Sequence, residues 1–153
     1  VHSVYAHHAG SWASIQRDNQ FCLPQTVFCC CAHDAWLNNP QLCVEFYNMR
    51  RREALAAKPN AAHYAIARLQ KVFPDTQIIT QNIDNLHERA GSHDVIHLHG
   101  ELTKLRSETN QLATIDLDGW EQHYGDRHPD GSLLRPYVVF FACASIDGRT
   151  NYV

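Results

Sequence analysis

The sequence predicts an α/β fold built on a parallel sheet, with a small inserted domain. Between residues 40 and 98, two stretches with helical spacing are followed by two short apolar stretches with strand character. A third apolar stretch begins near residue 136, after a long polar segment. This alternation favours parallel pairing, because a parallel connection needs a crossover segment that is usually helical. The long polar segment is then expected to be the insertion.

Two helices are predicted from their caps and from the spacing of apolar residues. The first begins after Asn39-Pro40, since proline suits the first helical position, and its apolar residues are Leu42, Cys43, Phe46 and Met49. The second begins after Asn60, a good N-cap residue, and ends before Pro74. Its buried stripe is expected to consist of Ala62, Ala65, Ile66, Leu69, Val72 and Phe73.

The strands are expected at residues 76–80, 94–98 and 136–141, where apolar runs lie between turn signals. A short helix at residues 86–90, closed by Gly91, separates the first two strands. Residues 101–132 are polar and rich in glycine, so we expect an insertion without a strong core there. Residues 1–31 show no clear period, and no element is predicted for them.

Composition bounds the class of protein. The 153 residues include 44% hydrophobic and 19% charged positions, which suits one soluble globular domain. The formal net charge of -3 gives no basic surface, so nucleic acid is not an expected partner. The longest apolar run, at residues 138–144, is far below the roughly 20 residues that cross a membrane. We therefore predict a cytoplasmic protein without a membrane partner.

Cysteine and histidine raise the question of a metal. The six cysteines contain no Cys-x-x-Cys pair, and three of them are adjacent, so reduced buried thiols are the expected state. His97 and His99 lie two apart on a predicted strand and share one face, where His93 or His87 could join them around a metal. A histidine-rich metal-binding protein is therefore one alternative, although the spacing is not that of a closed zinc site.

Polar residues follow both central strands where these strands end. Gln81, Asn82 and Asp84 come after the first, and His99 after the second. In open parallel sheets, ligands bind beyond the carboxyl ends of the strands. Amides and a carboxylate suit a neutral ligand with amide and hydroxyl groups. The alternative is that the Asn and Asp residues only cap the helix that begins near Asn85.

His99 is the candidate general base. An imidazole with an ordinary pKa near 6.5 can take a proton from a hydroxyl close to neutral pH. Gly100 follows it and would permit the close approach of a ligand. For His97, a strand histidine with satisfied hydrogen bonds is the preferred interpretation.

The motifs TQNIDNLH at residues 80–87 and HLHGEL at residues 97–102 resemble those of the sirtuin family of NAD-dependent protein deacylases, in its bacterial form. The resemblance extends to FYNMRRR at residues 46–52, PNAAH at 59–63 and LRPYVVFF at 134–141. It covers about residues 32–141. It implies a Rossmann-like parallel sheet with a small inserted domain that lacks its zinc ligands.

The resemblance implies a role for each polar residue. His99 matches the catalytic base, which acts on a hydroxyl of the nicotinamide ribose. Asn82 and Asp84 match residues that line the nicotinamide pocket, Ile83 its apolar neighbour and Gln81 a ribose contact. The implied cofactor is NAD, and the implied partner is an acylated lysine of a protein substrate. The reaction releases nicotinamide and O-acyl-ADP-ribose.

The resemblance also implies an acyl-binding side. Tyr47 and Arg50 lie three apart on the first helix and match residues that accept succinyl or malonyl groups. A guanidinium can bind a carboxylate through two hydrogen bonds, which suits that role. Val138 and Phe141 match the strand beside the acyl-lysine tunnel, although a core strand would explain them equally well. The alternative for Arg51 and Arg52 is a solvated run at the helix end.

Three departures from the family pattern limit this expectation. The Gly-Ala-Gly-x-Ser turn that cradles the pyrophosphate in the family is missing, and Ala9-Gly10-Ser11 matches it only weakly. Ala142-Cys143 replaces the expected Gly-Glu. Residues 101–135 contain no cysteine, and Ser107 stands where a first zinc ligand is expected, so zinc is not an expected cofactor.

We therefore expect a partial catalytic domain at residues 32–141, incomplete at both ends. Within it, residues 101–132 are a small-domain remnant, and residues 1–31 and 142–153 are unassigned. The alternative function is a catalytically impaired fragment that only binds acyl-lysine or nicotinamide.

Overall fold

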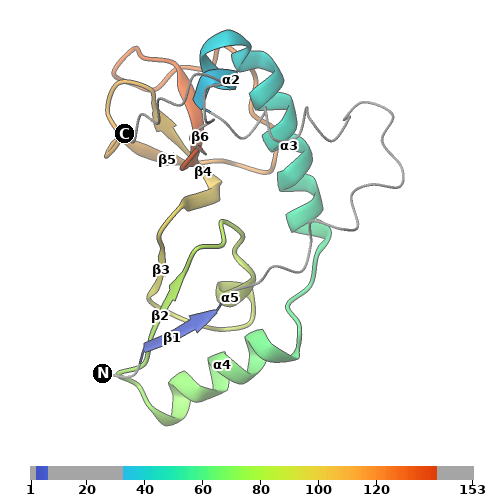
Figure 1. Ribbon diagram of the computed structural model, residues 1–153, viewed down its shortest axis with the longest axis vertical. Coiled ribbons are helices and arrows are strands. Elements are labelled where there is room, and N and C mark those ends of the chain that lie inside the picture. The colour runs from blue at the N-terminus through green and yellow to red at the C-terminus, as the bar shows by residue number, and fades with distance from the viewer. Residues whose placement is uncertain (1–2, 7–32, 141–153) are drawn as a thin grey trace, which may run out of the picture.

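The computed structural model describes residues 3–6 and 33–140, and Figure 1 shows its elements. The remaining residues, among them Phe141, the tail at 142–153 and most of the segment at 1–31, lie outside the description. In chain order the elements are β1 (Ser3–Ala6), α2 (His33–Asn38), α3 (Pro40–Ala56), α4 (Ala61–Val72), β2 (Gln77–Thr80), α5 (Leu86–Arg89), β3 (Val95–His97), β4 (Gly100–Ser107), β5 (Thr114–Asp116) and β6 (Leu134–Val138). Strand β1 was not predicted, because four residues are too few to show a period.

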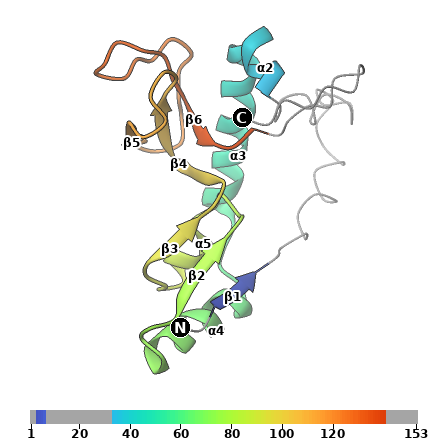
Figure 2. The same cartoon turned by 60° about the vertical axis from the view of Figure 1, so that its left-hand side comes forward.

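The strands form two sheets with different pairing. β1, β2 and β3 form a parallel sheet in that order, with Ile79 opposite Ile96 in β2 and β3. β4 pairs antiparallel with both β5 and β6. Figure 2 shows the parallel sheet in one half of the molecule and the antiparallel sheet in the other. The prediction of an α/β fold with a parallel sheet is confirmed.

In the C-terminal half, one strand pairing was not predicted and one expectation is wrong. The third predicted strand corresponds to β6, which pairs antiparallel with β4. The polar segment also contains the eight-residue strand β4, in which Leu102 and Leu105 are buried. The buried positions of β4 do not alternate regularly, so its sequence shows no clear two-residue period. Its core contacts come from α3 and β6, which are distant in sequence.

The start predicted for α3 and the cap predicted for α4 are confirmed. The Asn39 side chain accepts a hydrogen bond from the Leu42 backbone N–H at 3.1 Å, and Pro40 begins α3. The Asn60 side chain accepts from the backbone of Ala62 and His63. Each cap satisfies donors that the first helical turn leaves without partners.

The buried face of α4 differs from the predicted stripe. Its buried residues are His63, Ala67 and Gln70, whereas the predicted core residues Val72 and Phe73 are 68% and 48% exposed. Gln70 is buried because its amide donates to the carbonyl oxygens of Thr76 and His93. An apolar pattern does not predict such a face, since a polar side chain can be buried once it is hydrogen-bonded.

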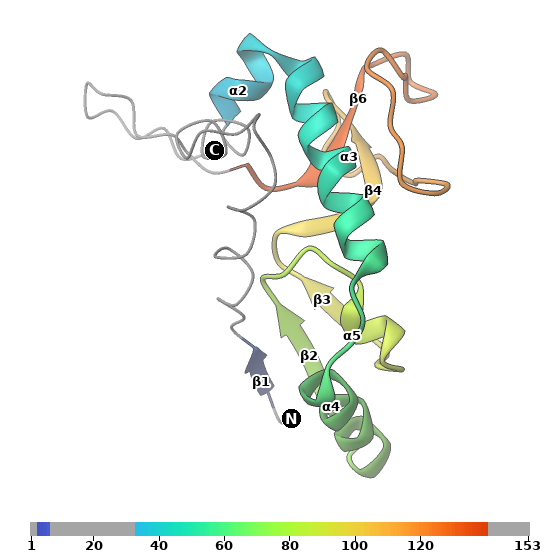
Figure 3. The same ribbon diagram turned by 90° about the vertical axis from the view of Figure 1, so that its right-hand side faces the viewer.

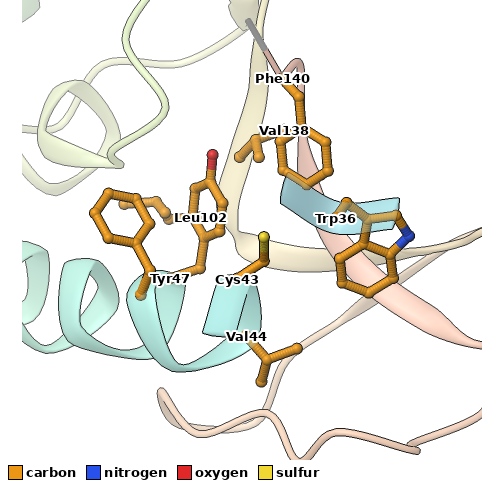
Figure 4. Packing of buried hydrophobic residues seen from close by; sticks show 8 residues of the cluster. Trp36, Cys43, Val44, Tyr47, Leu102, Val138 and Phe140 are labelled. Atoms are coloured by element: carbon orange, nitrogen blue, oxygen red, sulfur yellow. The ribbon is translucent and has the colours of Figure 1, made fainter. Parts of the chain in front are cut away.

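The main core lies between α2 and α3 on one side and β4 and β6 on the other (Figure 4). Three aromatic rings of the core pack against one another. The centroid of the Phe140 ring lies 6.2 Å from that of Trp36 and 5.8 Å from that of Tyr47. Figure 3 shows α3 running from α2 past β4 toward the parallel sheet. Helix α3 therefore links the core to the ends of the parallel strands.

Ser107 joins three segments of the antiparallel half through one buried hydroxyl. The hydroxyl lies 2.7 Å from that of Ser132 and 3.2 Å from that of Thr109, and it accepts from the Asn110 backbone N–H. Ser132 in turn donates to the Asp130 carboxylate, which holds the pKa of Asp130 below its usual range. Hydrogen bonds thus connect the segments around the position where the sequence placed a first zinc ligand.

We predict that Ser107→Ala lowers the free energy of unfolding by about 2 kcal/mol, because the substitution leaves buried partners of the hydroxyl unpaired. Urea unfolding followed by circular dichroism measures the change. Gln111→Ala, at an exposed neighbouring position, is the control and should change stability by less than about 0.5 kcal/mol. Equal stability of the two variants would contradict a structural role of this hydroxyl.

Among the helices in the part of the chain that the structure describes, none is long and apolar enough to span a bilayer.

Candidate functional site

The polar loop after β2 lies along the segment that joins β3 to β4. The Leu98 N–H donates to the carbonyl oxygen of Thr80 at 2.9 Å, which continues the parallel ladder. Four residues further along the chain, the Leu102 N–H donates to the carbonyl oxygen of Ile83 at 2.8 Å. Residues 81–84 and His99 are therefore neighbours at the carboxyl edge of the parallel sheet.

His99 occupies the two-residue connection between β3 and β4 and is half-buried. Its backbone carbonyl accepts a hydrogen bond from the Val139 N–H at 3.0 Å, which ties the connection to the end of β6. Within residues 3–6 and 33–140, the His99 imidazole has no hydrogen-bond partner. Its ring nitrogens are thus available to a ligand while its backbone is held in place.

Gly100 has a structural role that was not predicted. Its φ of +83° lies in the left-handed region, and a Cβ at this position would overlap the backbone carbonyl of Tyr137. Gly100 pairs with Val138 in the antiparallel sheet. The close approach is therefore to the β6 backbone, and the glycine lets the chain turn from the parallel sheet into the antiparallel one.

Some polar groups of the loop make local hydrogen bonds, and others have no partner among the described residues. The Asn82 N–H donates to the Thr80 hydroxyl, and Ile83 packs against the main core. One oxygen of Asp84 accepts from the Leu86 N–H at 3.1 Å, so the capping interpretation holds for this carboxylate oxygen. The Asn85 side chain, by contrast, makes no capping bond. Among the described residues, the amides of Gln81 and Asn82 have no partner.

The residues predicted for the acyl side lie on α3 and near the end of β6. Tyr47 is 4% exposed and packs edge-on against Phe46. Arg50, one turn further along α3, is paired with Glu53 at 2.6 Å. Val138 is buried in the core, and Phe141 lies outside the described residues. Tyr47 and Val138 thus have core contacts whether or not they also face a ligand.

Arg51 is a structural residue that sequence reasoning missed. The solvated interpretation is wrong for Arg51, which is 3% exposed. Its guanidinium donates to the Leu102 carbonyl oxygen and to the Asn48 side chain, each at 2.8 Å. Burial lowers the pKa of Arg51 to about 10. Its contacts hold α3 against β4 beside the loop, and no signal in the sequence separates it from its exposed neighbour Arg52.

The histidines near the site have separate environments. His93 is exposed and pairs with Asp94, whereas His63 and His87 are buried with ring centroids 4.8 Å apart. Burial, together with the nearby His63, lowers the pKa of His87. His97 is hydrogen-bonded through both ring nitrogens, as predicted for a satisfied strand histidine. In the described ranges, no three His, Cys, Asp or Glu side chains are placed to hold a metal ion.

The fold and the polar groups define an α/β protein with a candidate ligand site at the carboxyl edge of a parallel sheet, where this class binds its ligands. A family model described as the Sir2 family matches residues 6–148, a wider range than the motifs alone suggested. The chain belongs to the Sir2 family, and the prediction made from its motifs is confirmed.

Similar proteins agree with this assignment. An NAD-dependent protein deacylase of Bacteroides thetaiotaomicron is 42% identical over 127 residues, which are 78% of this chain and 54% of that protein. A solved Sir2 homolog–NAD complex has a TM-score of 0.66 at 36% identity and covers 73% of this chain and 44% of its own. A structure of Sir2 bound to acetylated peptide has a TM-score of 0.58 at 30% identity and covers 74% and 49%. The chain thus spans about half the length of these proteins.

Proposed function

We propose that this chain carries the nicotinamide and acyl-lysine side of an NAD-dependent protein-lysine deacylase. The observation that carries the proposal is that backbone bonds of Leu98 and Leu102 bring the segment containing His99 alongside the loop at residues 81–84. The relatives named as NAD-dependent protein deacylases support it.

The side chains at this edge fit the proposed cofactor. Amide groups of Gln81 and Asn82 can pair with a carboxamide, and the second oxygen of Asp84 can accept from a hydroxyl. When bound, NAD supplies the ribose carbon that receives the acyl oxygen and the nicotinamide that leaves. Asn82, Asp84 and the apolar Ile83 would hold the nicotinamide, and Gln81 would contact the ribose.

His99 would take a proton from a ribose hydroxyl. Its fixed backbone and unpaired imidazole meet the two demands of a general base, which are position and an available nitrogen. Arg51 and Gly100 contribute indirectly, since they hold α3, β4 and β6 around the loop.

The partner is an acylated lysine of a protein, bound on the side of α3 and β6. We assign Tyr47 and Arg50 to an acidic acyl group such as succinyl or malonyl, and Val138 and Phe141 to the acyl-lysine tunnel. Removal of acetyl, succinyl and malonyl groups is therefore proposed. We further propose a cytoplasmic protein whose partners include neither nucleic acid nor a membrane, in keeping with the net charge of -3.

The proposal is tested by incubating the protein with NAD and an acetyl-lysine or succinyl-lysine peptide. Mass spectrometry is expected to detect free nicotinamide and the deacylated peptide together. Binding of the peptide or of nicotinamide without any release would favour the alternative, a fragment that binds but does not turn over. Metal that copurifies stoichiometrically would favour the histidine-rich metal-binding alternative.

We predict that Arg50→Met lowers removal of succinyl about tenfold relative to acetyl, because one charge-assisted hydrogen bond to a carboxylate contributes roughly 1.5 kcal/mol or more. The ratio of initial rates on the two peptides is the measurement. Arg52→Met is the control, because it removes the same charge from a neighbouring residue that is not assigned to the acyl group. The Arg52 guanidinium lies over the Trp120 ring instead, 4.8 Å from its centroid. Equal losses on both peptides in Arg50→Met would contradict the assignment.

A further inference from the structure

His97 connects the polar loop to the short helix α5. Its Nδ1 lies 2.7 Å from the carbonyl oxygen of Asn82, and its Nε2 lies 2.8 Å from a carboxylate oxygen of Glu88. The side chain of His97 is 4% exposed, whereas that of Glu88 is 39% exposed. One buried ring therefore links the first polar loop residues to a helix on the protein surface.

The chemistry of the two partners determines the protonation of the ring. A backbone carbonyl only accepts, so Nδ1 must carry a hydrogen to bond Asn82. A carboxylate also only accepts, so Nε2 must carry one to bond Glu88. A neutral imidazole has a single N–H, and only the imidazolium makes both bonds. With Glu88 ionised, the two bonds thus need a charged ring at this buried position.

The electrostatic surroundings agree with this requirement. Burial lowers the pKa of His97, but the hydrogen bonds to Glu88 and Asn82 and the charge of Glu101 on β4 raise it above its ordinary value. His87 on α5 also acts on His97, and burial keeps the pKa of His87 low, so it adds little positive charge near neutral pH. Burial raises the pKa of Glu88, but the hydrogen bond from His97 outweighs this, and the net pKa lies below its usual value.

We propose that His97 is a positioning residue, which as an imidazolium holds the Asn82 carbonyl against α5 and makes the shape of the loop at residues 81–84 depend on pH. The pH range follows from the charge. A histidine whose pKa is raised on folding stabilises the fold fully below its unfolded value near 6.5, and this contribution is lost as pH rises through the folded pKa. Above that point one of the two bonds is lost and the loop loosens.

This inference rests on the proposed function only where it concerns nicotinamide, so the two parts are tested separately. The first test follows the His97 ring and the Ile83 amide, which shares a peptide unit with the Asn82 carbonyl, by NMR across pH in the intact chain. We expect the Ile83 amide to titrate with the midpoint of His97. A midpoint for Ile83 that does not follow His97, or a neutral ring below pH 6, would overturn the proposal.

Glu88→Gln tests the role of the carboxylate. Glu88 lies on the surface, so we expect the variant to fold. Its amide removes the charge that favours the imidazolium, and the midpoints of His97 and Ile83 should move together to lower pH. Asp94→Asn is the matched control, because Asp94 pairs with the exposed His93, and it should leave both midpoints in place. An unmoved midpoint in Glu88→Gln would overturn the proposal.

The second test measures nicotinamide affinity by calorimetry at the same pH values. We expect the affinity to fall as pH rises through the His97 midpoint, and this fall to move to lower pH in Glu88→Gln. If the Ile83 amide titrates but the nicotinamide affinity does not change across the His97 midpoint, the link between His97 and nicotinamide is overturned. Absence of nicotinamide binding at every pH would overturn the proposed function, and a joint titration of His97 and Ile83 would still support the role of His97 in the loop.

Discussion

In the His99→Ala variant, the rate of peptide deacylation is expected to fall by about 10²-fold to 10⁴-fold. General base catalysis by a positioned side chain contributes an acceleration of this order. The His99 imidazole has no hydrogen-bond partner among the described residues, so its removal should leave the fold intact. Initial rates measured with NAD and an acyl-lysine peptide give the change.

Another histidine provides the control for this prediction. His93→Ala also removes an imidazole, but His93 is exposed and pairs with Asp94 away from the loop. The rate of this variant should stay within about twofold of the parent, since surface substitutions away from a site usually have small effects. A His99→Ala variant with the parent's rate would exclude His99 as the base. Thermal unfolding of both variants separates a loss of chemistry from a loss of structure.

The largest loss of stability is expected for Gly100→Ala, about 3 kcal/mol. One part is the strain of an L side chain at a φ of +83°. The other part is the overlap between the new Cβ and the Tyr137 carbonyl, which forces β4 and β6 apart. Urea unfolding measures the difference in the free energy of unfolding.

The chain offers a glycine that separates the two parts. Gly91 has a φ of +96°, but a Cβ there would meet no atom within 4 Å. Gly91→Ala should therefore lose only the strain contribution, about 1 kcal/mol. Equal losses in the two variants would show that the contact between Gly100 and β6 adds nothing to stability.

Several features of the site followed from local sequence. The helix start at Asn39-Pro40 and the Asn60 cap are as predicted, because a cap acts within four residues of itself. The polar residues 81–84 and His99 were expected at strand ends, and backbone hydrogen bonds bring these two segments alongside each other. Parallel pairing is sufficient for this result, since the carboxyl ends of neighbouring strands meet at one edge.

Other features depended on distant partners and were not predictable. Arg51 and Arg52 are adjacent and chemically identical, yet one is buried and the other exposed. The difference arises because the Leu102 carbonyl, 51 residues away, accepts from Arg51. For the same reason Gln70 replaces Val72 on the buried face of α4, since the carbonyl oxygens of Thr76 and His93 are available to it.

The sequence by itself therefore determined the helices α3, α4 and α5, the strands β2 and β3, the start of α3, the cap of α4 and the family, because these depend on residues that are close in the chain. Only the tertiary structure decided that β6 leaves the parallel sheet and that Gly100 is required for backbone packing. It also decided that His97 bonds through both nitrogens. Each of these depends on a carbonyl or carboxylate from another segment, and the position of that group is known only once the chain has folded.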